Sequence, residues 1–376
     1  MNKINSINLI NFKAYKNQTF DFEGLTVFCG SNSVGKSTAI QALGILLQSN
    51  CGRNVNINGE LVNVGDIDDI HNFFNRSEET LKITLNTDKF TASWGYENID
   101  QKEYLARKNM LPRINHTNNN EKISDESNEA GSNIIYQYLH AERFGPRNNL
   151  PMAEHNHNYD WLGTKGEFTI EVLESLISEK RLELENEDIR KHPSTGKSHS
   201  VYSNIEAWME EITPGYKMNP KKIKEARLSY NTVLPPHGYE TKPINVGFGY
   251  SYALSVVTAL LISKRGDVVI IENPEAHLHP KGQSYLGRLI ALSSMSGLQI
   301  IIETHSEHII NGIRLMIRSG SVIANNVIFY NIYNNNLESK VVKIKLNQQA
   351  QFSSWPENFF DQQAIDMDML ISGGVI

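Results

Sequence analysis

A phosphate-binding loop near the N-terminus constrains this chain more than any other feature of its sequence. The loop matches the pattern G-x-x-x-x-G-K-[ST] in full, as Gly30-Ser31-Asn32-Ser33-Val34-Gly35-Lys36-Ser37. Residues 25–29, just before it, form an apolar run typical of a buried strand, and residues 37–48 place apolar side chains on one helical face. A strand, a glycine-rich loop and a helix in this order predict a site for the phosphates of a nucleotide.

The residues of the loop have separate roles in such a site. Gly30 and Gly35 let the backbone turn so that successive N–H groups point at phosphate oxygens, and the helix start adds positive potential. Lys36 brings a charge to the β- and γ-phosphates, and the Ser37 hydroxyl is a magnesium ligand. We therefore expect ATP and Mg²⁺ as ligands, and assign to ATP binding Gly30, Asn32, Ser33, Val34, Gly35, Lys36, Ser37 and Thr38.

Two later apolar runs end in residues that complete such a site. Residues 268–271 precede Glu272, a pattern that predicts a buried strand ending in a carboxylate for magnesium. Residues 299–302 form a second run, followed by Glu303, Thr304 and His305. A histidine at this edge of the sheet, one strand from the acid, is expected to contact the γ-phosphate or orient a water molecule, although a lone histidine is usually structural.

A second glycine-rich turn precedes the acidic strand. Gly247, Gly249 and Ser251 stand at the start of a predicted helix, where free backbone N–H groups favour an anion. With the expected strand order, this helix start cannot reach the nucleotide on Lys36 of its own chain. Two interpretations remain: a plain glycine turn, or a site for the γ-phosphate bound to a second copy of the chain.

The other hydrophobic patterns predict an α/β fold in several parts. Before the loop, residues 4–10 and 20–22 read as strands, and β-hairpins are expected at residues 57–62, 81–85 and 90–94. The asparagine-rich residues 112–133 predict an exposed, poorly ordered loop. Helical patterns follow at residues 168–184 and 205–212, with a loop at 191–197.

Residues 244–345 alternate between strand and helix patterns, which implies a largely parallel sheet covered on both faces. Helices are expected at 252–262, 280–293 and 307–318, and strands at 268–271, 299–302, 326–330 and 341–345. We divide the chain into residues 1–154 with the phosphate loop, a helical insertion at 155–240, a second part of the same head at 241–345 and a small tail at 346–376.

Composition narrows the class of protein further. No apolar run approaches the ~20 residues of a membrane span, and the first six residues lack the pattern of a signal peptide. Cys29 and Cys51 are the two cysteines and indicate reduced thiols, so a cytoplasmic protein without a membrane partner is expected.

The formal net charge of −6 disfavours a protein that coats DNA by phosphate neutralisation alone. A nucleic-acid partner remains possible through a local patch, and the basic residues between 217 and 227 are the candidate. The alternative there is a solvated helix start after Pro220.

In their order along the chain, these motifs resemble the ABC-type AAA ATPases that group with RecF, the structural-maintenance-of-chromosomes (SMC) heads and the overcoming-lysogenization-defect (OLD) proteins. Residues 9–13 are similar to the family's N-terminal strand, residues 272–280 to its Walker B segment, and residues 303–306 to its switch-histidine segment. Residues 138–147 resemble a motif of the short bacterial members, and residues 355–361 resemble a small C-terminal domain of unassigned function.

The resemblance implies an ABC-ATPase-like P-loop head with a mixed, largely parallel sheet, an N-terminal antiparallel β part and a helical insertion. It also implies an ATPase whose two nucleotide sites are completed when two copies close on each other. Many such proteins belong to bacterial anti-phage systems, commonly beside a separate effector.

Three residues or segments depart from the family pattern. Glu272 replaces the usual Walker B aspartate and remains able to hold magnesium through water. Asn273 stands where the catalytic glutamate is expected, and an amide cannot act as a general base. Glu275 is the substitute if the turn brings it near the attacking water; otherwise hydrolysis is slow and the protein is an ATP-gated switch. The signature, residues 247–251, differs from Leu-Ser-Gly-Gly, which puts the contact to a second copy in doubt.

Three functions compete on these observations. The first is an ATPase that dimerises on ATP and controls a nuclease or toxin; the second is a RecF-like head that clamps or repairs DNA. The third, a nuclease like the OLD proteins, needs a further metal-binding domain, and the roughly 70 residues after His305 are too few for one. Asp361, Asp366 and Asp368 lie in that tail and are not expected at strand ends.

For Arg143 and Arg147, a structural ion pair with a carboxylate such as Glu142 is expected, with phosphate binding as the alternative.

Overall fold

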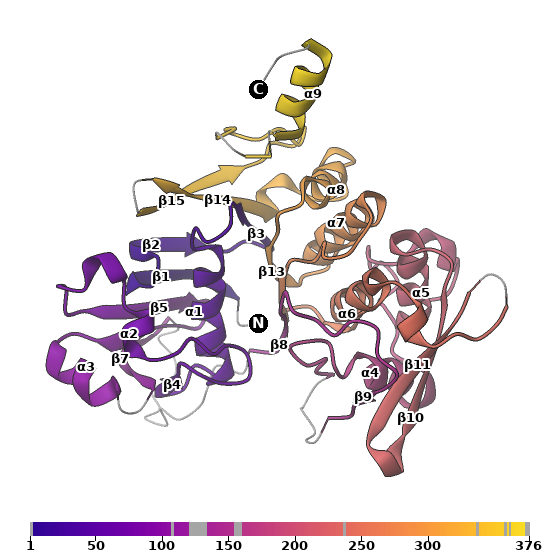
Figure 1. Ribbon diagram of the computed structural model, residues 1–376, viewed down its shortest axis with the longest axis horizontal. Helices are drawn as coiled ribbons and strands as arrows, with labels where there is room; N and C mark the ends of the chain where they lie inside the picture. The colour runs from indigo at the N-terminus through magenta and orange to yellow at the C-terminus, as the bar shows by residue number, and fades with distance from the viewer. Residues whose placement is uncertain are drawn as a thin grey trace.

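The computed structural model describes residues 3–106, 109–119, 134–153, 160–235, 238–335, 338–356, 359–360 and 362–372. In this part of the chain, two six-stranded sheets stand side by side, and a group of helices with a three-stranded sheet covers the outer face of one of them (Figure 1). None of the helices described is long and apolar enough to cross a membrane.

The central sheet carries the phosphate loop. Its strand order is β15-β14-β3-β13-β12-β8, in which β15 is antiparallel and the others are parallel to their neighbours. The bounds are β3 Leu25–Gly30, β8 Tyr136–Leu139, β12 Val268–Glu272, β13 Gln299–Glu303, β14 Val327–Asn335 and β15 Glu338–Lys345. Each interior strand is paired on both sides, so its backbone groups are satisfied within the sheet.

Both faces of this sheet are buried, which explains the unbroken apolar runs of its strands. Val269 and Ile300 pack into a core with α6 (Phe248–Ile262), α7 (Pro280–Met295) and α8 (Glu307–Arg318). Ile270 and Ile301, pointing the other way, share a second core with α1 (Lys36–Gln48) and the N-terminal sheet. The predicted α/β class and its largely parallel sheet are confirmed.

The N-terminal sheet is antiparallel, in the order β2-β1-β5-β6-β7-β4. Its bounds are β1 Ile4–Phe12, β2 Tyr15–Asp21, β4 Asn54–Asn56, β5 Leu81–Thr87, β6 Phe90–Tyr96 and β7 Met110–Asn118, with short helices α2 Ile67–Ile70 and α3 Ile99–Ala106 beside it. Two predictions were wrong here. Residues 112–118, expected in a loop, belong to β7, and residues 57–62, expected as strand, lie outside β4. The remainder of the predicted loop, from residue 120, lies outside the described residues.

The region of the helical insertion mixes helices with strands. It contains α4 (Thr169–Ser175), followed by a π-helical turn that ends at Arg181 in the left-handed region, and α5 (Val201–Ile212). β10 (Lys217–Ile223) and β11 (Leu228–Leu234) form a hairpin beside β9 (Leu150–Pro151). The predicted helix start after Pro220 was therefore wrong: Pro220 lies in β10, an edge strand, where a residue without an N–H is tolerated.

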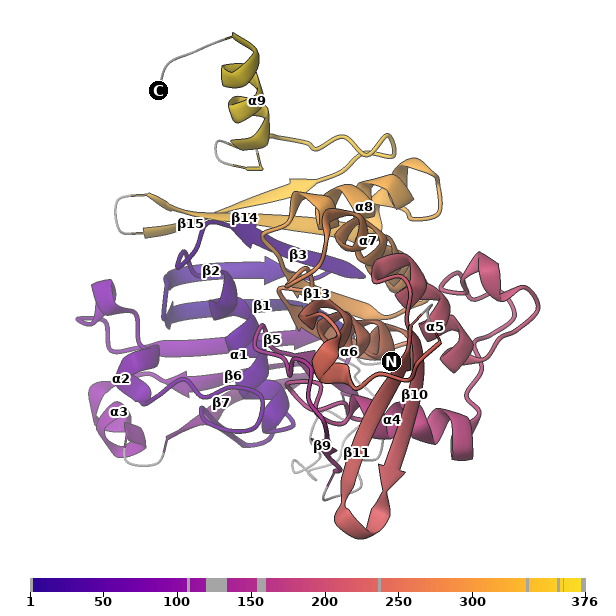
Figure 2. The ribbon, with the colours of Figure 1, turned by 45° about the vertical axis from the view of Figure 1, so that its right-hand side comes forward.

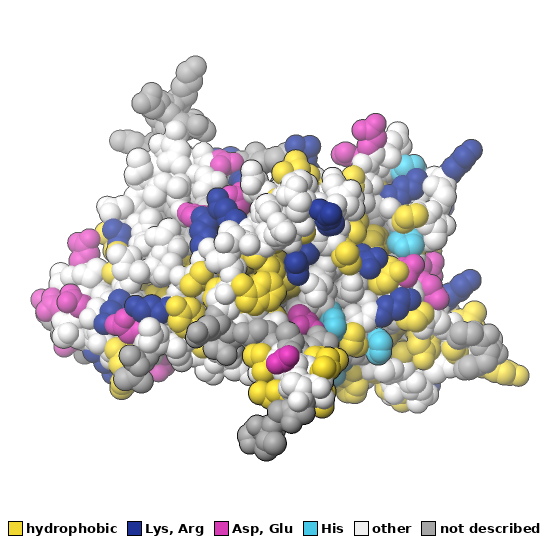
Figure 3. Space-filling view, turned by 90° about the horizontal axis from the view of Figure 1, so that it is seen from above, with side chains coloured by type: hydrophobic (Ala, Val, Ile, Leu, Met, Phe, Trp, Pro, Cys, Tyr) yellow, Lys and Arg dark blue, Asp and Glu magenta, His cyan; other side chains and the backbone are white. Residues whose placement is uncertain are grey.

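The C-terminal segment leaves the sheet through an aromatic cluster. Phe352 and Phe359 pack edge-to-face, and Phe352 does the same with Phe329 of β14. The last helix, α9 (Gln362–Ser372), projects from the body, as Figures 1 and 2 show. Its described side chains from Ile365 onward are exposed, and Figure 3 shows apolar side chains gathered at this face. Asp366 and Asp368 are exposed on this helix and not at a strand end, whereas Asp361 lies outside the described residues.

Candidate functional site

The phosphate loop has the backbone geometry that its glycines predict. Gly30 has φ +130° and Gly35 φ +102°, both in the region that favours glycine. A Cβ on Gly30 would lie 2.0 Å from the carbonyl oxygen of Ile332 in β14. Gly35 caps α1 without a side-chain hydrogen bond, so no side chain competes with an anion for the first N–H groups of the helix. Val34 and Thr38 are buried, whereas Asn32 and Ser33 are exposed.

Glu303 lies between the two functional side chains of the loop. Ser37 Oγ donates a hydrogen bond to Glu303 Oε2 at 2.8 Å, and Lys36 Nζ lies 3.7 Å from Glu303 Oε1. Lys36 also donates to the Ser31 carbonyl at 2.5 Å and is 3% exposed. Burial lowers the pKa of Lys36, and the Glu303 charge partly offsets that effect. Sequence reasoning missed Glu303 as a site residue because its place depends on β13 lying next to β3.

Three carboxylates gather at this edge of the sheet. Glu272 and Glu303 are direct partners in the parallel register of β12 and β13, and Glu275 follows in the turn after β12. Burial raises the pKa of Glu303, and the charges of Glu272 and Glu275 add to that rise, while Ser37 and Lys36 oppose it. The site therefore concentrates negative charge that a cation would stabilise.

Glu272 is held by the end of β8. Its carboxylate accepts hydrogen bonds from Tyr138 Oη at 3.1 Å and from the Ala141 N–H at 3.2 Å, and His140 Nδ1 lies 3.7 Å away. Burial raises the pKa of Glu272, but these three partners outweigh burial and the net shift is downward. Glu272 is thus kept ionised, as a metal-binding carboxylate must be.

Glu275 and His305 are joined through the backbone. Glu275 accepts hydrogen bonds from the His305 N–H at 2.7 Å and from Thr304 Oγ1 at 2.8 Å. Burial raises the pKa of Glu275 despite these bonds. Burial lowers the pKa of His305, as does the charge of Lys36, and a contact with the Gly30 carbonyl opposes them. The structure therefore brings His305 to the start of the phosphate loop.

Asn273, in the position of a catalytic base, has an unusual environment. Its φ is +46°, its N–H donates to the Glu303 carbonyl at 2.8 Å, and its side-chain Oδ1 is buried without a hydrogen-bond partner. A buried acceptor of this kind carries a desolvation cost that a water molecule or ligand would relieve.

Arg143 fixes the end of the acidic strand, a role that the sequence did not reveal. Its guanidinium donates to the carbonyls of His140, Glu272 and Asn273, each at 2.7 Å, and the residue is 3% exposed. The guanidinium also lies 5.1 Å from the ring centroid of Tyr252 in α6. The expected ion pair with Glu142 was wrong, because Glu142 pairs with Lys165 at 2.9 Å.

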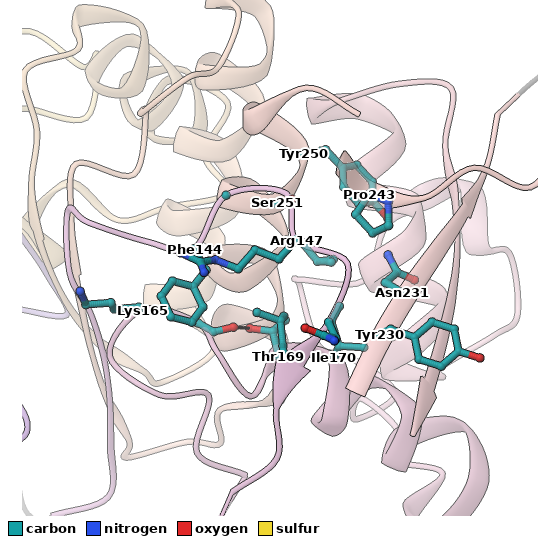
Figure 4. A pocket seen from close by; sticks show the side chains of 15 residues that line it. Phe144, Arg147, Lys165, Thr169, Ile170, Tyr230, Asn231, Pro243, Tyr250 and Ser251 are labelled. Atoms are coloured by element: carbon teal, nitrogen blue, oxygen red, sulfur yellow. Dashed lines mark hydrogen bonds between the residues drawn. The ribbon is translucent and has the colours of Figure 1, made fainter. Parts of the chain in front are cut away.

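The signature-like residues form the start of α6. Gly247 is its N-cap, and a Cβ on Gly249 would lie 2.6 Å from the His277 carbonyl, in the loop that follows the acidic strand. Ser251 lines a cavity together with Phe144, Arg147 and Tyr250, and residues 30–37 do not line it (Figure 4). Within its own chain, Ser251 therefore lines a cavity separate from the phosphate loop.

The basic stretch in the β10–β11 hairpin is partly paired with carboxylates. Lys222 Nζ lies 2.6 Å from Glu174 and 3.4 Å from Glu179, and Lys224 lies 3.7 Å from the same Glu179. These pairs offset part of the positive charge of the stretch.

The oxygen donors of the site fit magnesium. Ser37 supplies a hydroxyl oxygen, and Glu272 and Glu303 supply carboxylates on adjacent strands, the donor types that Mg²⁺ prefers. Among the residues described, no group of three or more His, Cys, Asp or Glu side chains converges tightly enough to hold a metal ion alone. This is consistent with a Mg²⁺ that is shared with nucleotide phosphates.

Comparisons with known proteins agree with this architecture. Residues 25–311 match a family model described as "AAA domain, putative AbiEii toxin, Type IV TA system", and residues 327–370 match one described as a protein of unknown function (DUF3696). A search of curated proteins gave no match.

Two solved structures have a similar fold. One is an SMC head bound to the C-winged helix domain of ScpA, with 14% identity, a TM-score of 0.50 and coverage of 92% of this chain and 98% of that one. The other is an SMC head with an extended coiled coil bound to the C-terminal domain of ScpA, from Pyrococcus furiosus, with 11% identity, a TM-score of 0.51 and coverage of 99% and 100%.

Proposed function

Because the chain belongs to this AAA-domain ATPase family, we propose that it binds Mg-ATP at the phosphate loop, dimerises on it, and gates a separate effector, a nuclease or toxin, in bacterial anti-phage defence. The observation that carries the proposal is the contact of Ser37 and Lys36 with Glu303 at the start of α1. A cationic amine, a hydroxyl and a carboxylate thus meet at the end of the phosphate loop, and these are the groups that Mg-ATP binding in such a loop uses.

In this proposal the loop binds ATP through its backbone N–H groups and Lys36. Mg²⁺, when bound, neutralises the phosphate charge, and Ser37, Glu272 and Glu303 are the residues that would hold it. The Lys36 amine, now bonded to the Ser31 carbonyl, exchanges this partner for phosphate oxygens. Tyr138 and Ala141 keep the Glu272 carboxylate fixed during that exchange.

The activation of water is the slow part of the proposed reaction. Glu275 is bonded to Thr304 and to the His305 backbone, so its carboxylate is engaged in positioning the histidine segment. Asn273 offers an acceptor oxygen that can orient a water but cannot take its proton. We therefore propose slow hydrolysis, with Glu275 as the base and His305 as the residue beside the γ-phosphate.

Two partners follow from the proposal. A second copy of the chain would present Gly247, Gly249 and Ser251 at the start of α6 to the γ-phosphate. A separate effector has a candidate contact in the exposed apolar side chains of α9, and the similar SMC heads are themselves recorded with a bound protein partner.

The test combines nucleotide binding with co-purification. Lys36→Ala should abolish binding of a fluorescent ATP analogue, because the only amine in the loop is lost, and should also abolish ATP-dependent assembly. Unchanged affinity in that variant contradicts the site. The tagged wild type, purified with its neighbouring gene products, should retain an effector in an ATP-dependent manner; the same retention by Lys36→Ala would contradict gating by ATP.

A further inference from the structure

We propose that Arg147 is a phosphate-binding residue that acts in trans, on the ATP held by a second copy of the chain. The inference rests on the proposed ATP-dependent dimer and adds to it a residue outside the signature-like segment. The charge of Arg147 has no partner among the residues that the structure describes.

Arg147 is exposed and makes no hydrogen bond or ion pair with any residue that the structure describes. Its guanidinium carbon lies 4.1 Å from the centroid of the Phe144 ring, so the planar group is held in one orientation by stacking. An ordered guanidinium with all its N–H donors free is suited to a two-point contact with phosphate oxygens.

The segment that carries Arg147 is fixed to the start of α6. Gly145 packs so closely on Phe248 that an added Cβ would lie 2.4 Å from the Phe248 ring. The Phe144 N–H donates to the Lys165 carbonyl at 2.9 Å, and Arg143 ties the same segment to the end of β12. Arg147 and the signature-like helix start therefore form one unit and would approach a ligand together.

Between them lies a small cavity of about 40 Å³ that opens to solvent, which Figure 4 shows. It is lined by Arg147, Ser251, Asn231 and Tyr250 among others. Tyr250 is 3% exposed, and its hydroxyl has no hydrogen-bond partner of normal geometry, although Asn231 lies close enough to affect its pKa. A buried O–H without an acceptor favours a ligand that brings one.

The geometry points to a terminal phosphate as that ligand. The helix start, an unpaired guanidinium and the Tyr250 hydroxyl all favour an oxyanion. The chain's own loop does not line this cavity, so the phosphate comes from a partner copy. An arginine supplied from one subunit to the ATP of another stabilises charge on the transferred phosphoryl group.

Single substitutions of Arg147 give the first test of the inference. In Arg147→Ala alone, affinity of the monomer for a fluorescent ATP analogue should stay within about twofold, while the dimer formed with Mg-ATP weakens about tenfold or more, the loss expected for a charge-assisted hydrogen bond. Arg147→Lys, which keeps the charge, should recover part of the dimer. Arg76→Ala is the matched control, because Arg76 is also exposed and stacked, 5.0 Å from the Phe73 centroid, but lies in the turn that precedes β5.

The decisive sample mixes differently tagged Lys36→Ala and Arg147→Ala chains. One of the two sites in the mixed dimer then combines an intact Lys36 with an intact Arg147. At a protein concentration below that at which Arg147→Ala dimerises with itself, light scattering and tag capture should therefore detect heterodimers. No heterodimer above the level of the separate variants would overturn the inference. A wild type that dimerises while Arg147→Ala does so equally overturns this inference alone, whereas a wild type that binds ATP and never dimerises overturns the proposed dimer as well.

Discussion

Glu303 accepts a hydrogen bond from Ser37 across 266 residues of sequence, at 2.8 Å. The bond joins the end of β13 to the first turn of α1, and it places a third carboxylate beside Glu272 and Glu275. The same carboxylate lies 3.7 Å from the Lys36 amine, so it contacts both side chains that are expected to engage ATP and its metal.

Glu303→Gln should therefore weaken the effect of Mg²⁺ on ATP affinity. Glutamine keeps the size and the acceptor for Ser37 but loses the charge, so we expect the Mg²⁺-dependent gain in affinity to fall about tenfold. Affinity measured with EDTA should stay the same or rise, because Lys36 loses a competing anion. Titration of a fluorescent nucleotide with and without Mg²⁺ measures both. The control is Glu338→Gln, at a half-exposed carboxylate on β15 that pairs with Lys16, and an equal loss in both variants would contradict the role of Glu303.

Glu275→Gln should slow turnover, whereas Asn273→Ala should not. A lost general base reduces the rate by about 100-fold or more, while removal of an amide that merely faces the site costs little. Single-turnover ATP hydrolysis in the two variants distinguishes them. The opposite ranking would assign the orientation of water to Asn273 and leave Glu275 a structural partner of Thr304 and His305.

Arg143→Ala should destabilise the protein by about 3 kcal/mol, because three partly buried carbonyls lose their donor and each unsatisfied group costs about 1 kcal/mol. Arg143→Lys should be intermediate, since an ammonium lacks the planar fork that reaches separate carbonyls. Urea unfolding followed by circular dichroism measures the loss. Arg147→Ala is the matched control and should unfold like the wild type.

Lowering the pH from 7 to 5 should destabilise the N-terminal sheet through His71. Its Nδ1 lies 2.6 Å from Tyr96 Oη, and burial lowers its pKa below the ordinary value of 6.5. The unfolded chain then binds a proton at a higher pH than the folded chain does, so stability is full above the ordinary pKa and is lost as the pH falls below it. His71→Gln should show a smaller change of unfolding free energy over this range. An equal pH dependence in both proteins would mean that other groups cause it.

The sequence predicted those elements whose signals are local. The apolar runs of β3, β12 and β13 and the helix at Glu307–Arg318 were found because each is buried or amphipathic by itself. β7 was missed because only one of its nine residues is buried, so its sequence looks like a loop, and β10 was missed because Pro220 suggested a helix start.

The residues of the candidate site also fall into those that a local pattern reveals and those that only the fold reveals. The phosphate loop can be recognised from eight consecutive residues, and its two glycines have the positive φ angles expected of them. Glu303 and Arg143 gain their roles from strand order and from a contact between distant segments, which no local pattern contains. The assignments of Glu275, Asn273 and the signature-like residues remain predictions.

The close approach of Gly30 to Ile332 has a consequence for the growing polypeptide. β3 is made early, but both of its neighbours, β13 and β14, come from residues 299–335. Most of the chain must therefore be synthesised before β3, which carries the phosphate loop, can pair with a strand on either side. Pairing between strands so distant in sequence is slow to form. A nascent or prematurely terminated product that ends before β13 carries the complete motif but lacks both strands that pair with β3. We therefore expect competence to bind nucleotide to appear only after β14 has been translated.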